Sequence, residues 1–118
     1  MRAKDAVGRY GEDVAVAHVQ AAGWTVLDRN WRCAVGELDV VCLDGRELVA
    51  VEVKTRRSDR FGSPAEAVTG AKLARLRRLT AAWLDAHDVH AASVRIDVIA
   101  VTLPPRGAAR VEHLVAVV

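Results

Sequence analysis

This chain has no stretch of about 20 apolar residues that could cross a bilayer. Its first residues, MRAKDAVGRYGED, carry charges before a hydrophobic region could form, which predicts that no signal peptide is present. Cysteine is also scarce: Cys33 and Cys42 match no metal-site spacing, so we expect both to be reduced core or strand residues. The expected compartment is the cytoplasm.

Aromatic side chains are few, with three tryptophans, one tyrosine and one phenylalanine among 118 residues. Proteins that bind single-stranded nucleic acid commonly stack its bases on aromatic side chains. With so few aromatic residues, sequence-specific recognition of single-stranded nucleic acid is not expected. The chain shows no repeat, linker or low-complexity segment. We therefore expect residues 1–118 to form a single domain, which is long enough to bury a core.

Positive charge is concentrated in one window although the net charge is only +2. Residues 54–78 hold eight lysines and arginines against two acids, whereas the remainder holds nine against thirteen acids. Such a window indicates a polyanionic partner. A solvated helix face followed by a basic loop is the alternative interpretation.

The segment GELDVVCLDGRELVAVEVKTR, residues 36–56, has the alternation of two short strands around a tight turn. The strands are expected at 37–43 and 48–54. Asp44-Gly45 between them is typical of a type I′ hairpin loop. A two-residue loop at that position would place Leu43 opposite Arg46.

Three acidic side chains meet in that register. Glu37 faces Glu52, and Asp39 lies diagonal to Glu52 on the same face, at about 7–8 Å. Like charges facing each other across a ladder are destabilising, and Lys54 alone cannot balance three acids. We therefore expect a bound divalent cation between these strands.

The residue types suit phosphodiester hydrolysis. Asp39, Glu52 and the backbone carbonyl of Val53 are hard oxygen donors for magnesium, which would neutralise phosphate charge and activate a water. Lys54, on the face of Glu52, could orient that water or balance the developing charge. The alternative is that Lys54 is only a salt-bridge partner of Glu52 on an exposed strand face.

Residues 5–22 carry the spacing of an amphipathic helix. Its predicted apolar stripe is Val7, Tyr10, Val14, Ala17, His18 and Ala21. A second stripe, Val16 and Val19, begins at Glu12. Taken alone, Glu12 fits an exposed acid near the helix N-terminus, and Gly23 is expected to end this helix.

The second half of the chain predicts a helix and two strands. Ser63–Glu66 has a capping-box pattern, and Thr69 could cap a second helix start. The expected inward residues of the helix are Leu73, Leu76, Leu79, Thr80, Trp83 and Leu84. Strands are expected at 94–103 and 111–118, and an earlier one at 24–30.

The predicted order is helix, three strands, helix, strand, strand. Three consecutive strands can form an antiparallel meander, and the long helix then crosses over to a fourth strand that is parallel to its neighbour. The expected fold class is α/β, with helices packed against a mixed sheet.

The segments GRYGEDVA, GWTVLDRNWR, GELDVV, VAVEVKTR, FGSPAEAV and RIDVIAV, with the helix that starts near Lys72, together resemble the YraN family. That family consists of small bacterial predicted endonucleases related to the PD-(D/E)XK fold and similar to archaeal Holliday junction resolvases. The resemblance implies a restriction-endonuclease-like αβββαβ core with an extra C-terminal strand. Leu38 stands where the founding signature has proline.

The resemblance also implies a site. Asp39, Glu52 and Lys54 correspond to the acid and the E-x-K of the nuclease signature, and Glu12 becomes the fourth site acid and a further candidate metal ligand. Glu37 is expected to be a metal ligand or a neighbour of the metal ligands. The residues expected to contact nucleic-acid phosphates are Arg56, Arg57, Arg60, Lys72, Arg75 and Arg78.

Two functions follow as hypotheses. The first is a nuclease that requires Mg²⁺ or Mn²⁺ and hydrolyses DNA, with branched and single-stranded forms among the expected substrates. The alternative is a nucleic-acid-binding module without turnover. Cutting two strands symmetrically would be easier for a two-fold homodimer.

Overall fold

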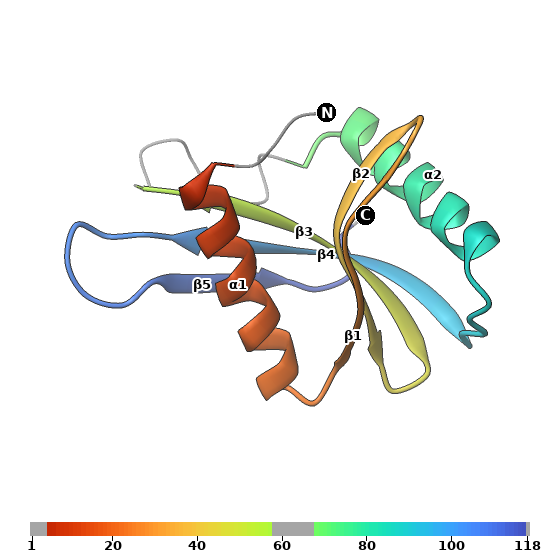
Figure 1. Cartoon of the computed structure of the whole chain (residues 1–118), viewed down its shortest axis with the longest axis horizontal. Helices are drawn as coiled ribbons and strands as arrows, with labels where there is room; N and C mark the ends of the chain where they lie inside the picture. The colour runs from red at the N-terminus through yellow and green to blue at the C-terminus, as the bar shows by residue number, and fades with distance from the viewer. Residues whose placement is uncertain (1–4, 58–67, 118) are drawn as a thin grey trace.

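Two helices and five strands make up the part of the chain that the computed structural model describes, residues 5–57 and 68–117 (Figure 1). They are α1 (Ala6–Ala21), β1 (Thr25–Cys33), β2 (Gly36–Asp44), β3 (Glu47–Arg56), α2 (Gly70–Ala86), β4 (Ser93–Thr102) and β5 (Arg110–Leu114). The predicted order of elements is confirmed. The capping box predicted at 63–66 lies outside the described residues, as does Arg60.

The strands form one mixed sheet in the order β1-β2-β3-β4-β5. The first three make the predicted antiparallel meander. β4 pairs parallel to β3 along its whole length, from Glu47–Ser93 to Arg56–Thr102, and β5 pairs antiparallel to β4. The fold is therefore α/β, with the expected αβββαβ core and an extra C-terminal strand.

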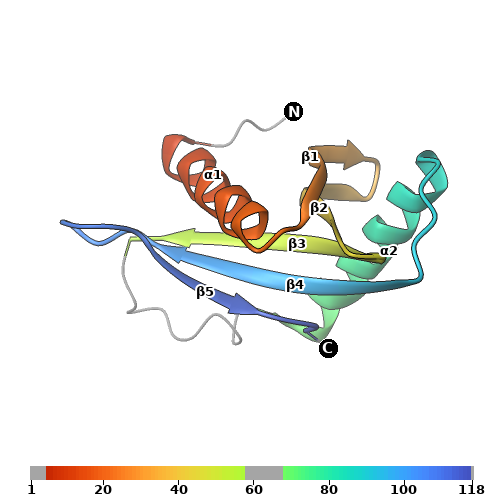
Figure 2. The same cartoon turned by 90° about the horizontal axis from the view of Figure 1, so that it is seen from below.

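The two helices cover opposite faces of the sheet, since α1 and α2 pack in separate core clusters. Figure 2 shows α1 above strands β3 and β4. Alternation along β3 explains this arrangement. Val49 and Val51 pack in the cluster with α1, whereas Leu48 and Ala50 pack in the cluster with α2. Neither described helix is long and apolar enough to cross a membrane.

Helix α2 buries the face that the sequence predicts. Thr69 is its N-cap, and its side-chain oxygen accepts a hydrogen bond from the Lys72 N–H at 3.1 Å. The buried residues are Leu73, Leu76, Leu79, Thr80 and Trp83, with Leu84 half-buried beside them. The cap fixes where the helix starts, and so places Lys72 in its first turn.

The predicted buried stripe of α1 is only partly confirmed, because Val7, Val14 and His18 are half-buried and none of its six residues is fully buried. Tyr10 is 53% exposed, and Ala17 and Ala21 are exposed as well. The helix instead buries Gly11, Glu12, Ala15 and Val19. Glu12 is thus in the interior, contrary to the interpretation of an exposed acid, and only Val19 of the second stripe is fully buried.

A close backbone contact sets this rotation of α1. A Cβ atom added to Gly11 would overlap the Thr55 side chain and come within 2.8 Å of the Thr55 Cβ. Only glycine lets the helix approach β3 so closely. Because Gly11 must face the sheet, its neighbour Glu12 is carried into the interior.

The turn between β2 and β3 differs from the prediction. Asp44 pairs with Glu47, so the two loop residues are Gly45 and Arg46. Gly45 has φ of 61° and stands first in the loop, as in a type II′ turn rather than type I′. The register therefore shifts by two, and the predicted Glu37–Glu52 pairing is wrong.

Arg95 of β4 explains why this register is stable. Its guanidinium Nη1 lies 3.0 Å from Asp44 Oδ2 and 2.7 Å from Glu47 Oε1. Two acids that face each other across a ladder would otherwise repel. These contacts come from a side chain about 50 positions away along the chain, so no local pattern in the hairpin sequence contains them.

Candidate active site

Strands β2 and β3 separate beyond the Val40–Val51 pair, and this opening is called the fork below. Both strands continue past it. β2 remains paired with β1 as far as Gly36, and β3 remains paired with β4 as far as Arg56. The fork therefore exposes backbone groups of two strands that are each held firmly on their outer side.

Asp39 occupies the fork and is only 7% exposed. Its Oδ2 accepts a hydrogen bond from the Val53 N–H at 2.9 Å, which substitutes for a ladder bond between the strands. The N–H and C=O of one strand residue point to the same side. The Val53 carbonyl oxygen therefore also faces the fork, beside the Asp39 carboxylate.

Glu52 lies next to Asp39, and the two carboxylates interact directly. Burial raises the pKa of Glu52, and the neighbouring charge of Asp39 raises it further, while Lys72 acts in the opposite direction. The predicted shared face is thus retained despite the wrong register, because a shift of two residues does not turn a strand over. The structure brings these two acids together.

Lys72 of α2, rather than Lys54, forms the ion pair with Glu52, with Nζ 2.8 Å from Oε2. Lys54 lies two residues after Glu52, hence on the same face, and is exposed. From the sequence, Lys72 is predicted only to bind phosphate. Its place in the first turn of α2 is the sequence feature that could have indicated its contact with Glu52 of β3.

Glu12 and Glu37 are each approached by an arginine of β1. Arg29 Nη2 lies 3.9 Å from Glu12 Oε1, and Arg32 Nε lies 3.6 Å from Glu37 Oε2. Glu12 is 2% exposed, whereas Glu37 is half-buried. Neither arginine was singled out from the sequence, because β1 reads there as an ordinary alternating strand.

The acid pair suits a hard divalent cation. Within residues 5–57 and 68–117, no group of three or more His, Cys, Asp or Glu side chains is arranged to hold a metal ion. Magnesium, however, is commonly held by one or two carboxylates and keeps several waters. The Lys72 ammonium already stands beside the pair as a positive charge. Asp39, Glu52 and the Val53 carbonyl therefore fit such an ion.

The basic residues predicted to contact phosphate differ in accessibility. Arg57, Arg75 and Arg78 are exposed, and Arg56 is half-buried. Lys72 is half-buried because it reaches Glu52. The basic side of α2, which consists of Lys72, Arg75 and Arg78, is therefore accessible at its two arginines.

Asp97 of β4 is a further buried acid, and its environment is different. Its carboxylate accepts hydrogen bonds from Arg95 Nε at 3.0 Å, from His113 Nε2 at 2.8 Å and from the Ala116 N–H at 2.8 Å. His113 Nδ1 in turn lies 3.2 Å from Nε2 of His18 on α1. These contacts, called the Asp97 network below, tie β4, β5 and α1 together.

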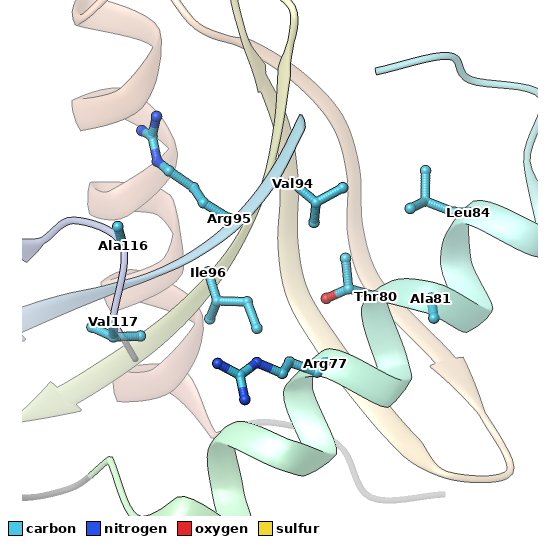
Figure 3. Close-up of a pocket in the computed structure, with 9 residues that line it drawn as sticks. All are labelled: Arg77, Thr80, Ala81, Leu84, Val94, Arg95, Ile96, Ala116 and Val117. Carbon is cyan, nitrogen blue, oxygen red and sulfur yellow. The ribbon is translucent and has the colours of Figure 1, made fainter. Parts of the chain in front are cut away.

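A cavity of about 410 Å³ lies between α2, the start of β4 and residues 116–117. Figure 3 shows Arg77 extending past Ile96 toward Val117, with Leu84 and Val94 at the other end. None of the residues predicted for the nuclease site lines it. The cavity is thus separate from the acid pair.

These features define an α/β protein with a pair of acids at a strand fork, of which Asp39 is buried and Glu52 is half-buried. The chain belongs to the uncharacterised protein family UPF0102, whose model matches residues 11–101. The predicted YraN-like family membership is thereby confirmed.

Several curated relatives carry only the name UPF0102 protein. One from Beutenbergia cavernae is 64% identical over 97% of each chain. One from Kineococcus radiotolerans is 62% identical over 99% of this chain and 97% of its own, and one from Frankia alni is 60% identical over 97% and 95%. These names state no activity.

Proposed function

We propose that this protein is a divalent-metal-dependent nuclease that hydrolyses phosphodiester bonds of DNA. The single observation that carries the proposal is the Asp39–Glu52 pair: two acids held together in a fork, with burial and mutual repulsion raising the pKa of Glu52. A fold normally avoids such a pair, and carboxylates whose pKa is shifted by burial and by a neighbouring charge are candidates for functional sites. The supporting features are the exposed Lys54 and the basic side of α2.

Each residue has a distinct task in this proposal. Asp39, Glu52 and the Val53 carbonyl would hold Mg²⁺ or Mn²⁺, which when bound neutralises phosphate charge and acidifies a water. The Asp39 carboxylate is oriented by the Val53 N–H. Lys54, on the Glu52 face, would balance negative charge at the phosphate or orient the attacking water. Arg75 and Arg78 would bind flanking phosphates of the substrate backbone.

A cleavage assay tests the proposal. The wild type is incubated with duplex, single-stranded and four-way DNA in the presence of Mn²⁺, beside Glu52→Gln and the exposed-site control Glu112→Gln. We expect cleavage by the wild type and the control, and a loss of at least about 100-fold for Glu52→Gln, as is typical when a charge-stabilising group is removed. Cleavage that Glu52→Gln leaves intact would refute the assignment.

The alternative function, binding nucleic acid without turnover, is favoured by one contact: Lys72 already neutralises Glu52 at 2.8 Å. Phosphate binding by arginines weakens steeply with salt, so a salt titration measures it. Tight, salt-sensitive binding together with no Mn²⁺ uptake in calorimetry would select this alternative.

The nuclease proposal includes a homodimer, because one small domain covers few base pairs and a two-fold pair can reach both strands. Sedimentation of the protein with and without four-way DNA tests this part separately. A monomer under all conditions would remove the dimer but leave the site assignment standing.

A further inference from the structure

Lys72 is the cation that α2 brings to the acid pair. Its Nζ lies 2.8 Å from Glu52 Oε2, and its side chain is only 23% exposed. The hydrogen bond from the Lys72 N–H to the Thr69 side chain fixes the first turn of α2, and so fixes where the lysine begins. The position of the Lys72 ammonium is thus set by the capped first turn of α2 as well as by its attraction to Glu52.

A divalent cation at Glu52 would need the space and the oxygen that this ammonium uses. Magnesium binds carboxylate oxygens at about 2.0–2.1 Å, closer than an ammonium does. Two positive charges within about 4 Å repel strongly in a partly buried site. The ammonium and the metal ion therefore compete for the Oε2 side of Glu52.

We infer that Lys72 is a positioning residue that holds the Asp39–Glu52 pair together in the metal-free protein, and that a divalent cation binds by displacing it from Glu52. The metal ion in this inference rests on the proposed function. The competition itself concerns binding and requires no cleavage.

Displacement has a second effect. Lys72 and Arg75 are three residues apart and therefore neighbours on the surface of α2. Once it has left Glu52, the ammonium lies beside the exposed Arg75 and adds one positive charge to the side that would bind phosphates. Metal binding and polyanion binding then strengthen each other, as linkage requires.

Lys54 provides a matched control. It belongs to the same strand as Glu52 and lies on the same face, but it is exposed and the ion pair of Glu52 is formed by Lys72. Removing Lys54 deletes one positive charge but leaves the Lys72 ammonium beside Glu52 Oε2. If charge alone matters, removing either lysine should tighten Mn²⁺ binding. If Lys72 and the metal ion compete for one position, only removing Lys72 should tighten it.

Calorimetric titration with Mn²⁺, in the absence of nucleic acid, tests the inference on wild type, Lys72→Met and Lys54→Met. Methionine keeps the apolar stem of Lys72, and Lys72→Gln serves if that variant does not fold. We expect Mn²⁺ to bind Lys72→Met about tenfold more tightly than wild type, and Lys54→Met within about twofold of it. Unchanged or weaker binding to Lys72→Met would overturn the inference but leave the nuclease proposal intact. No Mn²⁺ uptake by any of the three would overturn the metal site itself.

Thermal unfolding gives a second readout that does not depend on activity. By mass action, saturating Mn²⁺ should raise the Tm of Lys72→Met more than that of wild type. Without metal, Lys72→Met should unfold at a lower temperature than wild type because the acid pair has lost its counter-charge. Equal Mn²⁺-induced shifts in both proteins would contradict the competition.

Discussion

The Asp97 network and the Asp39–Glu52 pair are two acidic centres that differ in how their negative charge is compensated. The Asp97 network surrounds one carboxylate, 0% exposed, with a guanidinium, an imidazole and a backbone N–H. The Asp39–Glu52 pair places two carboxylates together, with contacts that include the Val53 N–H on Asp39 and the Lys72 ammonium on Glu52, and the pKa of Glu52 is raised. Buried charges are stable when they are fully hydrogen-bonded and paired. The first centre therefore supports the fold, and the second is the one at which we propose that a further cation binds.

The largest expected effect comes from removing the compensated acid. Asp97→Ala would leave Arg95 and His113 without the carboxylate that both contact, and we expect it to destabilise the protein by about 3–5 kcal/mol. Denaturant unfolding measures this loss. Asp88→Ala is the control, since that side chain is 99% exposed, and it should change stability by no more than about 0.5 kcal/mol. If Asp97→Ala lowers the free energy of unfolding no more than Asp88→Ala does, the Asp97 network does not stabilise the fold and the proposed difference between the two centres is wrong.

Gly11→Ala should have the next largest effect. Helix α1 carries His18, which belongs to the Asp97 network, and Glu12, the acid predicted for the other centre. The added methyl group would overlap Thr55, and overpacking of this kind costs about 1–3 kcal/mol. Gly70→Ala is the matched control because its Cβ would meet nothing within 4 Å, and it should be neutral or stabilising. Equal effects of the two substitutions in unfolding experiments would show that the contact with Thr55 is unimportant.

Removing the charge of Glu52 should act in the opposite direction. A raised pKa means that the folded protein binds this proton more tightly than the unfolded chain, so stability falls as pH rises from the unfolded pKa through the raised folded pKa. At neutral pH the ionised carboxylate is therefore unfavourable in the fold. Glu52→Gln should stabilise the metal-free protein by about 1 kcal/mol, in the range of single stabilising substitutions. If Glu52→Gln instead lowers the Tm at pH 7, Glu52 stabilises the fold as Asp97 does, and the prediction is wrong.

The smallest predicted effect is a pH dependence from the Asp97 network. Burial lowers the pKa of His18, and the neighbouring His113 lowers it further. The unfolded chain therefore binds the proton more readily, and the contribution of His18 to stability is lost as pH falls from about 6.5 through the lowered folded pKa. Free energies of unfolding between pH 7.5 and pH 5 should decline less steeply in His18→Gln than in wild type. His90→Gln, at a 97% exposed side chain, should keep the wild-type slope.

The sequence predicts the order of elements, the meander and parallel fourth strand, and the buried face of α2, because these follow from periodicity and from connection rules. It also predicts that Asp39 and Glu52 share a face, since that depends only on the parity of the register. The register itself depends on Arg95, a distant residue whose contacts no local pattern contains. The rotation of α1 similarly depends on Gly11 meeting Thr55.

The same limit applies to the site. Motif spacing selects Asp39, Glu52 and Lys54, and the structure places the first two together. The ion pair of Glu52 comes from Lys72, which depends on how α2 is seated across the sheet. Contacts of Arg29 and Arg32 with the remaining acids also arise from packing rather than from spacing. Sequence patterns thus identify the candidate site residues, whereas packing decides which groups compensate their charge.

The fork between β2 and β3 has a consequence for how this protein could change over time. Two more residue pairs past Val40 and Val51 would give the Val53 N–H a backbone partner in β2 and release the side chain of Asp39. Such a chain would gain regular sheet structure and lose the opening that gathers the oxygens. Selection for robustness alone would favour closing that gap, so its persistence in a lineage would itself be a sign that the opening is used.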